Sequence, residues 1–288
     1  YPRALGRSAH LSHREPRALP EPTCLYQPRG SRESILTWSS AKLLCGLVLL
    51  PLAPVDSSAA GDTHLPDRRE YRAPKAAAAL TIDGVADEAI WRQAAWQPLD
   101  QRWLGPEFSA EDFAGHFKVV WTEEKLYLLA EFTDDILIDT HRDPLLQYWD
   151  DDCLEIFLDE DFSGGNHQFN HNAFAYHMSL DNQAIDIGTD QQARNYSHHV
   201  ESRWQQLGDK VVWELAIDVY TDAYVDGSDA NTPTTLSAGK VMGLMVAYCD
   251  NDGSELRENF IGSETVNEGP TDRGWIDAGL FGALVLVD

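Results

Sequence analysis

Two tryptophans stand in polar segments of the sequence, where an indole ring could contact a ligand. Trp149 comes directly before three aspartates at 150–152, and Trp275 follows an Arg-Gly pair in a polar loop. A large apolar ring among turn residues either closes the end of a β-structure or offers a flat face to a ligand. Sugar rings have apolar C–H faces and a polar rim, so a sugar site needs aromatic rings with hydrogen-bonding neighbours. Both tryptophans have such neighbours, and the sequence alone leaves packing and ligand contact about equally favoured.

Two pairs of histidines lie close together in the sequence and are candidate metal ligands. His167 and His171 are four residues apart, which on a helix would place both imidazoles on one face. A Gly-Gly pair precedes them, strand-like residues follow and no carboxylate partner is evident, so we expect solvated loop histidines. His198 and His199 are adjacent, and adjacent residues of a strand point to opposite faces. Neither pair predicts a metal site.

Two short acidic segments could bind calcium. They are Asp-Asp-Asp at 150–152 and Asp-Asn-Asp-Gly at 250–253. Ca²⁺ takes about six to eight oxygen ligands, and the second segment lacks the later ligands of a complete calcium loop. An Asx turn explains each segment equally well. Because the formal net charge is -25, structural Ca²⁺ would relieve self-repulsion, and we expect it somewhere in the chain.

The charge and the missing motifs restrict the function classes. The chain has 22 Lys plus Arg residues against 47 Asp plus Glu. Such a protein repels phosphate backbones and anionic lipid, so we expect no nucleic-acid partner and favour neutral or cationic ligands. The sequence contains no Gly-X-Ser-X-Gly elbow, Walker loop or dinucleotide-binding glycine motif after a strand. Carboxylates are too abundant to indicate glycoside hydrolysis, which needs two at a set separation.

The first 60 residues are typical of a leader. Residues 1–40 are rich in Arg, Pro and Ser and show no apolar periodicity. An apolar stretch at 43–55 and small residues at 57–60 then form the pattern of an export signal cleaved near residue 60. The apolar stretch is shorter than the ~20 residues of a spanning helix, so we expect no membrane insertion. We therefore expect an exported protein, periplasmic or extracellular, with a linker at 61–79 and one domain at 80–288.

That domain contains two cysteines, Cys153 and Cys249. An exported protein permits a disulfide between them, but geometry decides whether it forms. Two buried free thiols are at least as consistent with the sequence. In either case the hydrophobic core must hold the fold, because a single bridge is far from the density of disulfide-rich scaffolds.

The elements that must position these side chains are mostly strands. Residues 117–132 alternate with period two around a turn at 122–125, which predicts a hairpin. Further strands are expected at 153–159, 173–180, 200–206, 211–219, 241–250 and 283–287, with a loop at 226–239. Trp121 and Trp213 occupy apolar positions of this alternation and should be core. With only a brief helical pattern at 86–95, the sequence predicts an all-β fold, a jelly-roll-like antiparallel β-sandwich with a short N-terminal helical turn.

Four segments, in order, resemble a family 9 carbohydrate-binding module, a DOMON-like β-sandwich. They are Ile-Asp-Gly-Val-Ala-Asp-Glu-Ala-Ile-Trp at 82–91, the hairpin at 117–132, the segment 149–159 and Gly-Trp at 274–275 before the last strand. The resemblance covers about residues 80–288, nearly the whole chain that would remain after cleavage near residue 60. It implies an exported, non-catalytic β-sandwich that grips the end of a sugar chain between two tryptophans, with structural calcium ions.

The resemblance also implies roles for five residues. Trp149 and Trp275 match the two sugar-stacking tryptophans of the family. Glu155 matches a glutamate that can accept hydrogen bonds from sugar hydroxyls. Asp272 stands where the family can carry an asparagine. His177 replaces a family arginine, which removes a permanent bidentate donor.

Partners and context follow from the same resemblance. Family members are often appended to enzymes that degrade xylan or other polysaccharides, so we expect xylan- or cellulose-like glycans as partners and carbohydrate catabolism as the context. The stretch 248–262, which includes Arg257, would add polar contacts to the sugar or form turns.

Two other functions stay open. The same architecture occurs in b-type haem electron-transfer domains, whose iron takes His or Met ligands. His177, Met178, Met242 and Met245 are present, but Met178 and Met242 fit core positions and no His-Met pair is fixed by spacing. A glycoside hydrolase, the less favoured alternative, would need two carboxylates facing one cleft.

Overall fold

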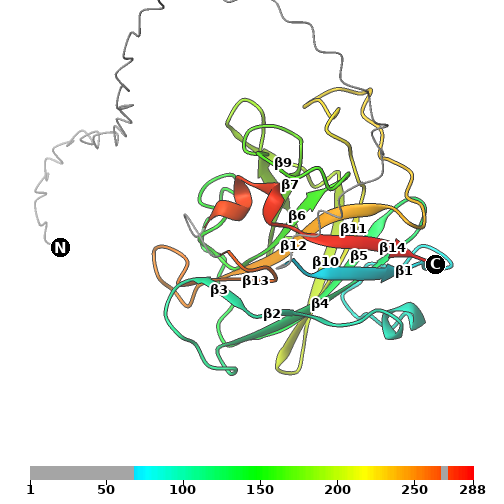
Figure 1. Cartoon of the computed structure of the whole chain (residues 1–288). Coiled ribbons are helices and arrows are strands. Elements are labelled where there is room, and N and C mark those ends of the chain that lie inside the picture. Colours follow the sequence, from blue (N-terminus) through cyan, green and yellow to red (C-terminus); the bar gives the residue numbers. More distant parts are fainter. Residues whose placement is uncertain (1–67, 267–271) are drawn as a thin grey trace, which may run out of the picture. The chain divides into compact units, whose positions relative to one another are not determined.

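The computed structural model describes residues 68–266 and 272–288, which form two β-sheets packed around a shared hydrophobic core (Figure 1). The expected leader at 1–60, with its export signal, lies outside the described residues. Among the described residues, no helix is long and apolar enough to cross a membrane.

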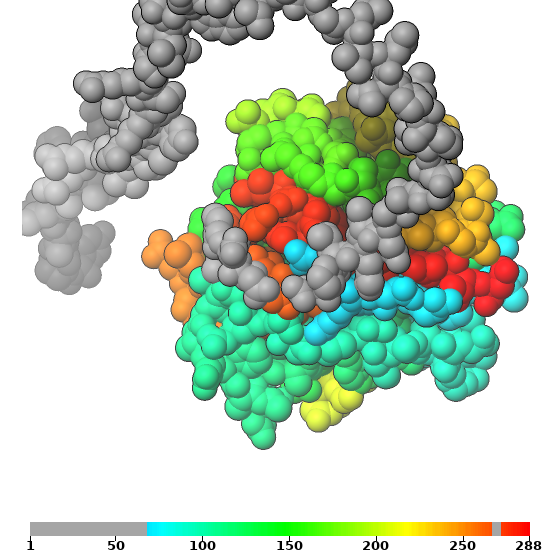
Figure 2. Space-filling model, viewed as in Figure 1, coloured from blue at the N-terminus to red at the C-terminus, as the bar shows by residue number. Residues whose placement is uncertain are grey.

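Nine strands make the larger sheet. Its order is β1-β14-β12-β6-β7-β8-β9, and β13 pairs with β12 and β3. The strands are β1 (Glu70–Pro74), β3 (Gln101–Leu104), β6 (Cys153–Asp159), β7 (Phe174–Ser179), β8 (Ala184–Ile187), β9 (Ala193–Asn195), β12 (Val241–Asp250), β13 (Asn259–Gly262) and β14 (Gly282–Val287). β1 runs parallel to β14, and the cyan band of β1 lies beside the red band of the C-terminal strand in Figure 2. All other pairs are antiparallel.

Five antiparallel strands make the smaller sheet, in the order β10-β11-β5-β4-β2. They are β2 (Gln97–Leu99), β4 (Phe113–Trp121), β5 (Leu126–Asp134), β10 (Val200–Leu207) and β11 (Lys210–Ile217). Three short 3-10 turns complete the described elements: η1 (Ala89–Arg92), η2 (Arg273–Trp275) and η3 (Ala278–Leu280). The fold is therefore the predicted all-β sandwich, and η1 is the expected N-terminal helical turn.

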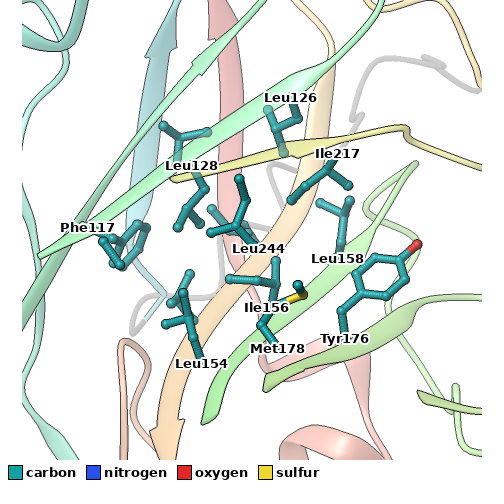
Figure 3. Close-up of a cluster of buried hydrophobic side chains, with 14 of the residues drawn as sticks. Phe117, Leu126, Leu128, Leu154, Ile156, Leu158, Tyr176, Met178, Ile217 and Leu244 are labelled. Atoms are coloured by element: carbon teal, nitrogen blue, oxygen red, sulfur yellow. The ribbon is translucent and has the colours of Figure 1, made fainter. Parts of the chain in front are cut away.

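The core lies between the two sheets because side chains alternate along each strand. Along β6, Leu154, Ile156 and Leu158 point into the core, and Figure 3 shows them meeting Phe117 and Leu128 of the smaller sheet. The intervening positions 153, 155 and 157 face outward from the larger sheet. Trp121 and Trp213 are fully buried, as predicted.

Both sheets carry further packed residues on their outer faces. A second cluster, with Phe157, Met245 and Phe281, covers part of the outer face of the larger sheet. A third cluster, with Trp91 and Leu129, covers part of the outer face of the smaller sheet. The two outer faces therefore lie on opposite sides of the sandwich.

The predicted strands correspond closely to observed ones. β6 and β12 have the predicted bounds, and the hairpin of β4 and β5 turns at 122–125, where Thr122 N donates to Lys125 O at 2.9 Å. The segment predicted as linker, 61–79, contains β1, so the sandwich begins before residue 80. Five further short strands, β2, β3, β8, β9 and β13, were not predicted because three or four residues carry too little alternation.

Candidate functional site

One pocket on the outer face of the larger sheet brings together all five residues that the sequence singled out. Its cavity is about 300 Å³, and it is lined by Tyr148, Trp149, Glu155, His177, Ile187, Arg257, Phe260, Asp272 and Trp275. Strands β6 and β7 supply its floor, because Glu155 and His177 are direct cross-strand partners. Loops before β6, before β13 and before η3 supply its walls. The pocket combines apolar rings with charged groups of both signs.

Trp149 enters the pocket from the loop that precedes β6. Its side chain is 38% exposed, although the preceding Tyr148 is buried. The Tyr148 ring meets Trp149 edge-on at 4.8 Å between centroids and meets His177 edge-on at the same separation. Tyr148 thus connects the exposed ring to the floor of the pocket and restricts its orientation.

Trp275 enters from η2 and is held by contacts beneath it. Gly274 packs so closely on Met245 that an added Cβ would lie 2.3 Å from the Met245 methyl carbon. His167 Nε2 lies 2.7 Å from Gly274 O, and Phe169 meets the Trp275 ring edge-on at 5.7 Å. The carbonyl can only accept, so His167 donates from Nε2.

The prediction of solvated loop histidines at 167 and 171 is wrong. Both are buried, and burial lowers the pKa of each. His171 also has a carboxylate partner, since its Nε2 lies 3.3 Å from Asp226. The partners lie 107 and 55 residues away along the chain (274 − 167 and 226 − 171), so local sequence could not reveal them.

Glu155 is a buried carboxylate with three polar partners. His177 Nε2 lies 3.1 Å and Arg257 Nη1 lies 3.4 Å from Glu155 Oε1. The Cys249 thiol donates to the same oxygen at 3.0 Å. An isolated buried carboxylate would be strongly destabilising, and these partners compensate its charge.

The pKa values of this group favour an ion pair. Burial alone would raise the pKa of Glu155, but the charge and hydrogen bond of His177, with the charge of Arg257, lower it. Burial likewise opposes the charge on His177, but Glu155 outweighs burial and raises the pKa of His177. Glu155 is thus an ionised hydrogen-bond acceptor at neutral pH, and its charge favours the protonated form of the His177 imidazole.

Arg257 supplies a guanidinium contact to Glu155. The resemblance implies that His177 replaces a family arginine, but a guanidinium reaches Glu155 in this structure because Arg257 approaches from the loop between β12 and β13. Arg257 lies 4.0 Å from the centroid of the Phe260 ring. Phe260 and Ile187 are pocket residues that sequence reasoning missed, because nothing in their local pattern distinguishes them from core residues.

The two cysteines are free and buried. Cys153 and Cys249 are cross-strand partners on β6 and β12. Besides donating to Glu155, the Cys249 sulfur accepts from Arg257 Nη1 at 3.1 Å. Of the two alternatives left by the sequence, the structure has the buried free thiols.

The two acidic segments of the sequence converge at one end of the sandwich. Oxygen atoms of Asp134, Asp152 and Asp250 lie within 4.8 Å of one another, and all three residues are buried. Three further aspartates extend this carboxylate cluster. An oxygen of Asp252 lies within 4.8 Å of oxygens of Asp112 and Asp250, and also of Asp134 and Asp135. Asp252 Oδ1 is buried and has no hydrogen-bond partner among the described residues.

The carboxylates of the cluster repel one another. Burial, and then the charge of Asp134, raises the pKa of Asp152 to about 9 and that of Asp250 to about 7. Burial raises the pKa of Asp134 to about 6, and the charge of Asp252 adds to this rise. Asn251 also makes the Asx turn that was the alternative for this segment, since its Oδ1 accepts from Gly253 N and Ser254 N at 2.8 Å each.

We expect the Glu155–His177 pair to give the protein a pH-dependent contribution to stability. A raised folded-state pKa means that the contribution of His177 is complete below its unfolded pKa of about 6.5 and is lost as pH rises through the folded value. The difference in unfolding free energy between wild type and His177→Gln should therefore shrink above pH 6.5, by about 1.4 kcal/mol per unit of pKa elevation.

Urea unfolding of both proteins at a series of pH values measures that difference. The comparison with His177→Gln is necessary because other histidines have the opposite effect. Burial lowers the pKa values of His167, His171 and His199, so their contribution to stability increases as pH rises. A difference that grows with pH would show that His177 is neutral in the fold.

The comparisons with known proteins identify the family and agree with the fold. Residues 82–288 match the protein family described as "Carbohydrate family 9 binding domain-like". A solved family 9 carbohydrate-binding module from Caldicellulosiruptor kristjanssonii, in complex with cellotriose, is 20% identical over 76% of this chain and 94% of its own, with a TM-score of 0.53. A structure of such a module from the same organism, in complex with glucose, is 19% identical over 76% of this chain and 95% of its own, with the same TM-score. No curated protein matches the chain.

Proposed function

The chain belongs to the family of carbohydrate family 9 binding domains, which are non-catalytic modules, and we propose that it binds the end of a glycan chain between Trp149 and Trp275. The observation that carries the proposal is the shared pocket: two partly exposed indoles and an ionised Glu155 line one cavity of about 300 Å³. That volume lies at the lower end of the range for small-molecule sites and fits a short terminal part of a glycan.

The pocket residues have different roles in binding the sugar. The tryptophan rings stack on the apolar C–H faces of the sugar and exclude water. Glu155 and Asp272 accept hydrogen bonds from hydroxyl groups, while Arg257 donates them. His177 contributes by holding Glu155, because both of its ring nitrogens already have partners. Because Glu155 is already held by His177 and Arg257, little side-chain freedom is lost on binding.

For the ligand we propose a gluco- or xylo-configured oligosaccharide from a cellulose- or xylan-like glycan. The family relationship supports carbohydrate in general, and two solved modules of similar fold are complexes with cellotriose and glucose. We also propose that the protein is exported to the periplasm or beyond and acts in carbohydrate catabolism. The apolar stretch at 43–55 followed by small residues supports export.

We propose structural Ca²⁺ at the carboxylate cluster. Asp134, Asp152 and Asp250, with Asp112 and Asp252, offer the hard oxygen ligands that Ca²⁺ prefers, and the unpaired Asp252 oxygen fits this use. The cation would neutralise carboxylates that otherwise repel one another. It would also join the segment before β6, which carries Trp149, to the segment after β12, which carries Arg257.

The haem alternative has no support in the structure. Met178 and Met242 lie in the core between the sheets, and Met245 packs in the cluster on the outer face of the larger sheet. Both ring nitrogens of His177 have partners, Ala175 O at 2.9 Å and Glu155 at 3.1 Å. The family relationship likewise excludes the glycoside hydrolase alternative, because the modules bind carbohydrate without catalysis.

Calorimetric titration with matched sugars tests the proposed function. We expect cellotriose and xylotriose to release heat on binding, and their borohydride-reduced forms to lose most of it, because reduction opens the terminal ring that stacks between the tryptophans. Equal affinity for reduced and unreduced forms would show that chain ends are not what the pocket holds. No binding of any sugar by folded protein would exclude these glycans as its ligands.

A further inference from the structure

A second cavity lies on the opposite side of the sandwich from the pocket of Trp149 and Trp275. It is about 470 Å³, and Lys118 of β4, Leu129 and Glu131 of β5 and Val212 of β11 line its floor. These four residues share the outer face of the smaller sheet, since they alternate with core residues. Trp96, from the loop after η1, forms one wall.

Trp96 differs from the packed tryptophans of this protein. Its side chain is 41% exposed, slightly more than that of Trp149. Five of the eight tryptophans in the described ranges donate their indole N–H within the fold: Trp91, Trp103, Trp121, Trp204 and Trp213. The other three, Trp96, Trp149 and Trp275, have no acceptor among the described residues. Trp96 thus shares exposure and an available N–H with the two tryptophans of the proposed sugar pocket.

Two residues of β4 contact the Trp96 ring and hold it in place. The Lys118 ammonium lies 4.3 Å from its centroid, and the His116 ring lies 4.0 Å away. Lys118 is only 9% exposed, and its Nζ donates to Trp91 O at 2.6 Å. Because a buried ammonium and an imidazole both contact the indole, the ring is oriented before any ligand arrives.

The surroundings of Trp96 indicate the class of ligand. Val85 and Leu207 are 43% and 44% exposed and add apolar surface beside the ring. Charged residues of the cavity are balanced in sign: Arg92, Lys118 and Lys210 against Asp87, Glu88 and Glu131. A phosphate or a carboxylate would meet as many acids as bases here. An apolar plate ringed by both donors and acceptors instead fits the face and hydroxyl groups of a neutral sugar.

We propose that Trp96 is the platform of a second carbohydrate site, which binds a neutral pyranose unit of a glycan chain on the outer face of the smaller sheet. This inference rests on the proposed carbohydrate-binding function. A second site on the opposite side of the sandwich lets one molecule contact two glycan chains, so retention on a polysaccharide exceeds the affinity of either site.

Fluorine NMR distinguishes the two sites directly. The full chain is labelled with 5-fluorotryptophan, and Trp96→Phe, Trp149→Phe and Trp275→Phe assign the three lines. Cellohexaose, xylohexaose and their borohydride-reduced forms are then added. We expect the Trp96 line to shift with both forms of one sugar, and the Trp149 and Trp275 lines to shift only with the unreduced form. A Trp96 line that stays unmoved by every sugar overturns the second site.

The same spectra separate this inference from the proposed function. If the Trp96 line shifts while the Trp149 and Trp275 lines do not, the second site stands and the first fails. Affinity electrophoresis in hydroxyethyl cellulose and in soluble xylan gives an independent measurement. Trp96→Ala should weaken retention about tenfold through lost bivalency, while Trp96→Tyr should keep most of it. Unchanged retention of Trp96→Ala in the gel that retains wild type would also overturn the proposal.

Discussion

Trp275→Ala is expected to lower the affinity for cellotriose or xylotriose by about 30- to 150-fold. A tryptophan offers about 150–250 Å² of surface, and covering half of it at ~25 cal/mol per Å² corresponds to about 2–3 kcal/mol. The loss should appear in binding and hardly in folding, because Trp275 lies in a short surface turn and contacts chiefly Phe169 and residues of the outer cluster. Calorimetry and urea unfolding measure the two quantities separately.

Trp275→Phe is the matched control for this experiment. It keeps a flat aromatic face of smaller area and should retain part of the affinity that Trp275→Ala loses. A Trp275→Ala protein that is folded and binds as tightly as wild type would exclude this indole from the site. A variant that binds less and also unfolds at much lower urea would indicate a structural role for Trp275.

Removal of divalent cations is expected to lower the melting temperature by about 5–10 °C. Saturation of a site at 100 times its dissociation constant stabilises the fold by about 2.7 kcal/mol, and 1 kcal/mol shifts the melting temperature of a domain this size by about 2–4 °C. The reason is the repulsion in the carboxylate cluster, where Asp152 and Asp250 have pKa values raised to about 9 and about 7. Thermal unfolding in EDTA, and then with excess Ca²⁺, measures the effect.

The double substitution Asp152→Asn with Asp250→Asn is the control for cation binding. It removes two carboxylates that could bind a cation while keeping side chains of similar size, so the protein should tolerate EDTA and should no longer respond to Ca²⁺. Sugar affinity should also fall in EDTA for wild type, because the cluster lies between the segments that carry Trp149 and Arg257. Identical melting curves of wild type in EDTA and in Ca²⁺ would count against a calcium site.

Much of the fold could be predicted because period-two alternation is a local signal. β6 and β12 are long, half of their residues face the core, and their bounds were predicted correctly. β1 was not predicted, because five residues at the edge of a sheet carry little pattern. Its parallel partner β14 also lies more than 200 residues away along the chain (283 − 70 = 213). Short strands formed by long-range pairing have no signature of their own.

The candidate site was predictable only in part, for a related reason. Trp149, Trp275 and Glu155 stand in recognisable motifs, so a resemblance could assign them. Arg257 reaches Glu155 from a loop that is 102 residues away along the chain, and no local sequence pattern indicates that contact. The carboxylate cluster is similar, since its aspartates come from the ends of several strands and meet only in the folded protein.

The pairing of β1 with β14 determines where the domain can be cut. The family match begins at residue 82, but a fragment that starts there lacks β1. Its β14 would become an unprotected edge, with free backbone groups able to recruit strands from other molecules. The core would also lose Tyr71 and Ala73, and Glu264 would lose the Tyr71 hydroxyl that donates to it. A fragment that begins at or before residue 68 keeps β14 paired with β1 and should aggregate less.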